Sequence, residues 1–222
     1  MGPRRVLCML ALLTLAACGP SEELKLHFLK GFVPGTRAIF LPTAVAVAPI
    51  RGELATGSHF AGNIYDPSGK VEQRLQVSEV GMLALQALIA SLADAGLKPV
   101  ALRAGVEPKD LPPRVEFMLI CELEKVAVEK RFRAQQTIHG QYFTMTSRVK
   151  LKYRLLRRDG AVISENEILG TEDEPPEPVG HEVFLPMETD LAESLSVALS
   201  RAVGLLVIDP KFRAVFPARI VP

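Results

Sequence analysis

Histidines and cysteines are the residues of this 222-residue chain best suited to metal-binding or nucleophilic chemistry. The four histidines are His27, His59, His139 and His181. They lie far apart in unrelated parts of the sequence, and no two of them fall at helical or turn spacing with a carboxylate, as a metal site would require. The chain also lacks the Gly-x-Ser-x-Gly motif that presents a nucleophilic serine. The sequence therefore predicts no metal site, no cofactor and no enzymatic activity.

The three cysteines are Cys8, Cys18 and Cys121. Cys121 ends the apolar run Phe117–Cys121, where a cysteine is expected to be a buried strand residue that packs as a small hydrophobe. The other two cysteines belong to the N-terminal segment. Because that segment is expected to be processed, Cys121 is left without a partner for an intramolecular disulfide.

The N-terminus has the layout of a signal peptide. A short basic stretch, Met1–Arg5, precedes an apolar run of 12 residues that ends at Ala17. This run is shorter than the roughly 20 apolar residues that a helix needs to cross a bilayer. Residues 1–17 are therefore interpreted as a cleaved signal peptide.

The end of the apolar run, Leu15-Ala16-Ala17-Cys18-Gly19, resembles the lipobox of bacterial lipoproteins. The resemblance implies that Cys18 becomes the first mature residue and carries the lipid, including palmitate, that anchors the protein to a membrane. In lipoproteins that are sorted by the next residue, Asp favours the inner membrane, whereas Gly19 stands here. The expected location is the outer membrane, facing the periplasm, and the inner membrane is the alternative.

Charge and composition exclude one class of partner. The formal charge of the chain is +1, and removal of residues 1–17 takes away Arg4 and Arg5 but no acidic residue, which leaves −1. A nearly neutral protein outside the cytoplasm has no basic excess for nucleic acid. We therefore expect membrane contact through the lipid anchor and no nucleic-acid binding.

Hydrophobic periodicity predicts an α+β fold. Strands are expected over 38–47, 115–128 and 143–155 and from Ala161 onwards, with a return to the sheet at 97–100, and helices over 79–95 and 190–207. The strand over 115–128 changes phase near Glu124-Lys125, which indicates a β-bulge. Asp159-Gly160 predicts a hairpin turn. The expected architecture is a two-layer sandwich, in which both helices pack on one face of a mostly antiparallel sheet.

The remaining segments complete the expected domain organisation. Residues 18–36 are interpreted as a lipid-anchored tether, 37–212 as a single domain, and 213–222 as a C-terminal tail. Within the domain, 51–77 is expected to be a long polar loop. Residues 172–187 are expected to be an acidic, proline-rich loop.

One charge pattern suggests a binding surface. Arg148, Lys150, Lys152 and Arg154 alternate with apolar residues, so all four cations should lie on the same face of a strand. They could contact an anionic lipid or an acidic partner. Alternatively, they could form cross-strand pairs with acidic residues of the preceding strand. Those residues are Glu116, Glu122 and Glu124.

The order of elements resembles a group of small bacterial envelope lipoproteins. The lipobox, the helix that ends at Ala95-Gly96-Leu97-Lys98-Pro99-Val100, two long strands, a hairpin and a last helix carry the resemblance. Its members are YajG-type lipoproteins, LptE-like lipopolysaccharide-assembly lipoproteins and the auxiliary lipoproteins of ABC-type lipid transporters.

The resemblance implies a non-enzymatic accessory or scaffold component of outer-envelope assembly or lipid-transport machinery, with an envelope protein complex as partner. A purely structural envelope lipoprotein and a periplasmic hydrolase are the alternatives. The chain departs from the LptE-like pattern because it contains no tryptophan.

We predict that Cys18→Ala abolishes lipid attachment and signal-peptide processing, because the thiol is the only group at that position that can accept the lipid. Metabolic labelling with palmitate measures the outcome. Label that still enters the mutant protein would contradict the assignment of Cys18.

Overall fold

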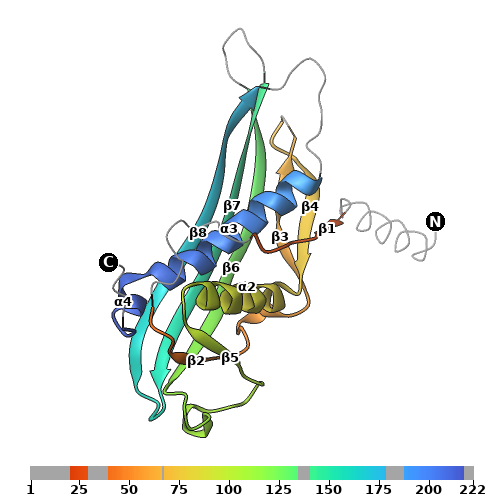
Figure 1. Ribbon diagram of the computed structural model, residues 1–222. Helices are drawn as coiled ribbons and strands as arrows, with labels where there is room; N and C mark the ends of the chain where they lie inside the picture. Colours follow the sequence, from red (N-terminus) through yellow and green to blue (C-terminus); the bar gives the residue numbers. More distant parts are fainter. Residues whose placement is uncertain (1–20, 30–39, 67, 135–140, 179–187, 218–222) are drawn as a thin grey trace, which may run out of the picture.

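The computed structural model describes residues 21–29, 40–66, 68–134, 141–178 and 188–217 (Figure 1). The strands are β1 (Ser21–Leu24), β2 (Ala44–Val47), β3 (Ser58–Tyr65), β4 (Val71–Ser78), β5 (Lys98–Ala101), β6 (Phe117–Ala134), β7 (Gln141–Arg157) and β8 (Val162–Pro178). The helices are α2 (Val80–Asp94), α3 (Glu188–Ile208) and α4 (Pro210–Arg213), with short 3-10 turns η1 (Glu53–Ala55) and η2 (Pro108–Asp110). The predicted α+β class is confirmed.

The long strand β6 organises one eight-stranded sheet. Along one edge it pairs antiparallel with β7, which in turn pairs antiparallel with β8. Its other edge is shared by β2 and β3, and both run parallel to it. Four of the seven described strand pairings are parallel and short, whereas the long pairings of β6 with β7 and of β7 with β8 are antiparallel, so the sheet is mixed. The reason is that α2 returns the chain from β4 across the sheet and β5 then lies parallel to β2.

The best-predicted part of the fold is the meander of β6, β7 and β8. The pairing of β6 with β7 shifts register between Leu123 and Lys125, which confirms the predicted bulge. The turn at Asp159-Gly160 joins β7 to β8, with Gly160 at φ +85°. Both features could be predicted because a strand period of two makes a change of phase visible in the sequence.

Helices α2 and α3 lie on the same side of the sheet (Figure 1) and share one hydrophobic core with it. Within α2, small residues such as Ala84 and Ala87 face the core together with Leu88, whereas Met82 is 56% exposed. Met82 therefore lies outside the core-facing side of α2. Among the described helices, only α3 is long and apolar enough to span a membrane, but 78% of that window is buried in the protein, as expected of a core helix.

The opposite face of the sheet is partly covered as well. Met118 and Ile120 of β6 point away from the helices and pack with Leu111, Val115 and other apolar residues in a second, smaller core. One end of this face is therefore buried, although the alternation along β7 predicts that the face is exposed to solvent. Further along β6, Lys130 lies on the helix-covered face and is fully buried, where the sequence alone would place a lysine in water.

The predicted loop over 51–77 is wrong, because this segment contains the hairpin of β3 and β4. Glycine is uncommon inside strands. Gly62, however, is required where two strands approach: a Cβ atom at Gly62 would lie 1.6 Å from the carbonyl oxygen of Val128 on β6. The acidic loop expected from residue 172 is also wrong up to Pro178, because β8 continues to that residue. Its prolines are tolerated on an edge strand. Residues 179–187 lie outside the described residues.

The predicted tether is wrong for residues 21–29. Strand β1 pairs with β4, and Leu24 is buried in the main core. The backbone amides of His27 and Leu29 then donate hydrogen bonds of 3.0 Å to the hydroxyls of Ser196 and Ser200 on α3. Residues 21–29 therefore belong to the packed structure.

The expected C-terminal tail also packs against the fold for its first residues. Phe216 is 4% exposed and contacts Phe40 and Phe212 in an aromatic cluster. The backbone amide of Leu41 donates to the Pro217 carbonyl. The tail expected from residue 213 is therefore wrong for 213–217.

We predict that Gly170→Ala destabilises the protein, because Gly170 of β8 lies directly under α3. A Cβ atom there would lie 2.0 Å from the carbonyl oxygen of Ala198 and 2.5 Å from the amide nitrogen of Ala202. Such overpacking costs about 1–3 kcal/mol of the free energy of unfolding. Chemical denaturation measures the change, and Leu169→Ala is the control because Leu169 is 50% exposed. Equal stability of the two variants would contradict this packing.

Candidate interaction surfaces

Cys18, the predicted lipidation site, lies outside the described residues, and its lipidation stays a prediction. Ser21, three residues further on, already pairs with Arg74 as the first residue of β1. A chain of three residues spans at most about 10 Å. If Cys18 carries the lipid, the membrane surface is therefore close to β1.

The four predicted cations are brought together on the outer face of β7. Lys150 makes ion pairs of 2.8 Å with Glu124 of β6 and 2.6 Å with Glu167 of β8. The hydrogen bonds that Lys150 donates to these two carboxylates, the bond to Glu124 first, raise the pKa of Lys150 to about 12. Among the described residues, Lys150 is the one member of the four that forms a salt bridge.

The neighbouring strands carry carboxylates at matching registers. Lys152 lies opposite Glu122 of β6 and Glu167 of β8, and Arg154 lies opposite Glu165. Of the acidic residues predicted as cross-strand partners, Glu124 pairs with Lys150 and Glu122 lies opposite Lys152. Glu116 does not join this group, because it lies beyond the start of β6, close to Arg157. The acidic partners on β8 were missed, although the alternation of Glu165 and Glu167 after the hairpin turn could have indicated them.

Strand β8 has an open edge. Within the described part of the chain it pairs with β7 only. Two of its carbonyls accept side-chain hydrogen bonds instead: Arg201 of α3 donates to Thr171 O at 2.7 Å, and Lys211 of α4 donates to Glu165 O at 3.4 Å. Peptide groups of alternate residues point to the same side of a strand. Glu167 and Leu169 lie between Glu165 and Thr171 in the sequence. Their N–H and C=O groups therefore also point to the open edge.

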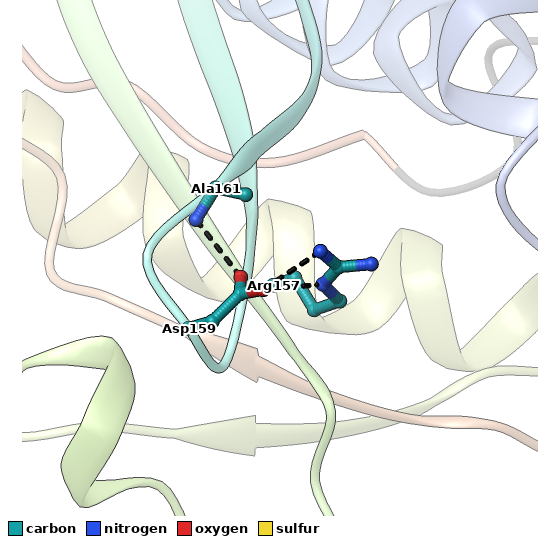
Figure 2. Close-up of polar contacts among 3 residues, drawn as sticks. All are labelled: Arg157, Asp159 and Ala161. Carbon is teal, nitrogen blue, oxygen red and sulfur yellow. Dashed lines mark hydrogen bonds and ion pairs between the residues drawn. The ribbon is translucent and has the colours of Figure 1, made fainter.

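A surface hollow of about 1100 Å³ lies at the end of the sheet, where the β7–β8 turn, the segment after η2, the start of β6 and α4 meet. Figure 2 shows the turn itself: Arg157 donates to the Asp159 carboxylate at 2.7 and 3.0 Å, and the Ala161 amide donates to its other oxygen at 3.0 Å. These hydrogen bonds lower the pKa of Asp159, and the bond from Arg157 has the largest effect. The turn is thus a preformed wall of the hollow.

A buried polar cluster connects this end of the sheet to α4. Asp209, at the N-terminus of α4, accepts hydrogen bonds from the Tyr153 hydroxyl, from Asn166 Nδ2 at 3.0 Å and from the Phe212 amide at 3.3 Å. Burial, and then the bond to Asp209, raise the pKa of the Tyr153 hydroxyl. Tyr153 is fully buried and beyond the reach of a substrate, so the cluster fixes α4 against β7 and β8.

The other residues with reactive side chains are not brought together. His27 and His59 lie on separate segments, and His139 and His181 are outside the described residues. Within the residues that the structure describes, no group of three potential metal ligands is close enough to hold an ion. Cys121 is 1% exposed, which confirms that it is a buried strand residue.

We predict that the Cys121 thiol does not react with a thiol reagent at pH 8 in the folded protein. Burial raises its pKa to about 12, so the thiol stays protonated, whereas an unfolded cysteine with a pKa near 8.5 forms the reactive thiolate. A colorimetric thiol assay with and without denaturant measures the difference, and Cys121→Ala corrects for background. Rapid reaction of the folded protein would contradict the packing of β6.

Comparisons with known proteins assign no family to this chain. No protein-family model and no curated protein matches the sequence. Among solved structures, a Xanthomonas campestris protein of the DUF330 family is 12% identical, with a TM-score of 0.47 over 84% of this chain and 92% of that chain. A minor lipoprotein of Acinetobacter baumannii is 4% identical, with a TM-score of 0.42 over 79% and 97%. A lipoprotein of Neisseria meningitidis is 17% identical, with a TM-score of 0.32 over 60% and 85%.

Proposed function

We propose that the protein is a non-enzymatic accessory lipoprotein of the cell envelope. Its Cys18 lipid anchors it in the outer membrane, facing the periplasm, and its domain holds a partner protein of outer-envelope assembly or lipid-transport machinery. The signal-peptide layout and the lipobox ending at Cys18 support the anchor. The resemblance in element order to small envelope lipoproteins supports the accessory role.

The open edge of β8 is the observation that supports binding of a partner protein. An exposed edge offers unpaired backbone donors and acceptors, and an extended segment of another protein can add to it as a further strand. Helix α3 covers one face of β8, so the edge and the outer face remain available. The Arg201 and Lys211 contacts limit the edge at Thr171 and Glu165, and an added strand would pair around Glu167 and Leu169.

The charge of β8 defines the chemistry of that partner. Strand β8 contains six acidic residues and no basic residue, namely Glu165, Glu167, Glu172, Asp173, Glu174 and Glu177. Two copies of this edge would repel each other, because like charges on facing strands are destabilising. An extended segment rich in Lys or Arg matches it instead. Leu169, 50% exposed on the outer face, would contact an apolar side chain of that segment.

The paired cations of β7 make a weaker candidate surface. Lys150 already has two carboxylate partners, and acidic residues lie opposite Lys152 and Arg154. An anionic ligand would have to compete with these carboxylates. We therefore assign the partner contact to the β8 edge and keep the β7 cations as control positions below.

We predict that a photoreactive amino acid at position 169, placed in the lipoprotein in intact cells, crosslinks to one envelope protein. The same amino acid at Met82, which is 56% exposed on α2, should give no such product. The double variant Glu165→Lys/Asp173→Lys reverses charges on either side of Leu169 and should reduce the product to background. Glu72→Lys/Glu193→Lys, which reverses exposed charges elsewhere, is the matched control and should leave it unchanged.

Mass spectrometry of the crosslinked product identifies the partner segment, which we expect to be extended and basic. An envelope-permeability assay of the charge-reversed strain then tests whether the contact matters in the cell. A crosslink that survives charge reversal would contradict the edge as docking site. The absence of any product at position 169 would favour a purely structural lipoprotein.

A further inference from the structure

The hollow at the β7–β8 turn has an excess of positive charge. Its lining includes the cations Lys109, Arg157, Arg158 and Lys211 and two carboxylates, Glu116 and Asp159. The Arg157 and Asp159 side chains are bound to each other (Figure 2). Lys109 is held by Glu107 at 2.8 Å, at the edge of the hollow. Arg158 and Lys211 are therefore the cations with capacity for a ligand.

These two cations are positioned without a carboxylate partner in the described residues. Arg158 donates through Nη2 to the Leu111 carbonyl, which uses one of its five N–H donors and orients the guanidinium. The Lys211 ammonium contacts the Glu165 carbonyl at 3.4 Å and is otherwise exposed. They come from different elements, the β7–β8 turn and α4, so a ligand between them must accept hydrogen bonds from separate directions.

Apolar side chains complete the lining. Phe117 and Val215 are partly buried and pack against the main core, and Ile163 is 40% exposed at the start of β8. Because Ile163, Phe117 and Val215 line the same hollow as the four cations, a ligand there meets both charged and apolar side chains. A ligand that satisfies both sides carries an anionic group and a hydrocarbon part.

We propose that this hollow binds the phosphate group of an amphiphile, with the phosphate held between Arg158 and Lys211 and the hydrocarbon part against Phe117, Ile163 and Val215. A tetrahedral phosphate presents oxygens in several directions and accepts a bidentate pair from a guanidinium. A planar carboxylate serves cations on different elements less well. The volume of about 1100 Å³ accommodates a phosphate and the first part of its chains. The proposal depends on the hollow alone, and not on the anchor or on the β8 partner.

Native mass spectrometry of the mature lipoprotein, released from an uncharged detergent, tests the proposal. The probes are dihexanoylphosphatidic acid, dihexanoylglycerol with the same chains but no phosphate, and inorganic phosphate. We expect one bound phosphatidic acid per protein and much weaker binding of the other two probes. Because exposed charges are screened by salt, raising the salt concentration in a solution binding assay should weaken the phosphatidic acid complex.

Variants locate the site. Lys211→Gln should weaken binding of phosphatidic acid about tenfold, as expected for the loss of one charge-assisted hydrogen bond. Ile163→Asn should weaken it about threefold to tenfold through the apolar side. The controls are Lys152→Gln, which removes an equal charge from the outer face of β7, and Val162→Asn, which changes an apolar residue that is 50% exposed next to Ile163. Melting curves verify that all four variants fold.

Three results would overturn the proposal. Inorganic phosphate that binds as tightly as phosphatidic acid would show an ion site without an apolar part. Dihexanoylglycerol that binds as tightly would show that the cations play no part. Equal binding by the Lys211 and Lys152 variants would place the ligand outside this hollow.

Discussion

The close packing of α3 against β7 and β8 determines where the N-terminal segment and α4 lie. Gly170 allows the helix backbone to approach β8 at Ala198 and Ala202, which no larger residue would permit. With α3 in that position, Ser196 and Ser200 can bind the chain that follows β1. At the C-terminal end of α3, Asp209 caps α4 and accepts a hydrogen bond from the Tyr153 hydroxyl. One helix therefore fixes both the N-terminal segment and the hollow.

This packing also decides which surfaces are free. Helices α2 and α3 occupy one side of the sheet (Figure 1), and the segment after β5 covers one end of the other. On the remaining outer face, the β7 cations lie among carboxylates of β6 and β8. Two surfaces keep charged side chains outside the salt bridges of the described residues: the edge of β8, with Glu165 and Asp173, and the hollow beside α4, with Arg158 and Lys211. Their opposite charges suit them to different ligands, a basic segment and a phosphate.

Sequence periodicity predicted the elements whose pattern is local and missed those that depend on distant partners. The alternation in β7, the bulge in β6 and the turn at Asp159-Gly160 were visible because neighbouring residues carry the signal. Strands β3 and β4 were not, because nothing near Gly62 in the sequence indicates the close contact that this glycine makes with β6. Likewise, the cations of β7 were predicted, whereas Arg158 and Lys211 line one hollow only because of the fold. No local pattern marks residues from four segments as one hollow.

Strand β8 offers an open edge around Glu167 and Leu169 within the described part of the chain. Residue-resolved amide hydrogen exchange of the purified protein, without residues 1–17, measures whether this edge is uncovered. Because these two amides should point away from β7, they are expected to exchange rapidly, while the amides of Ile168 and Gly170, bonded within the sheet, are expected to be protected. Equal protection of all four amides in the purified monomer would contradict the account, since it would show that the edge is already covered.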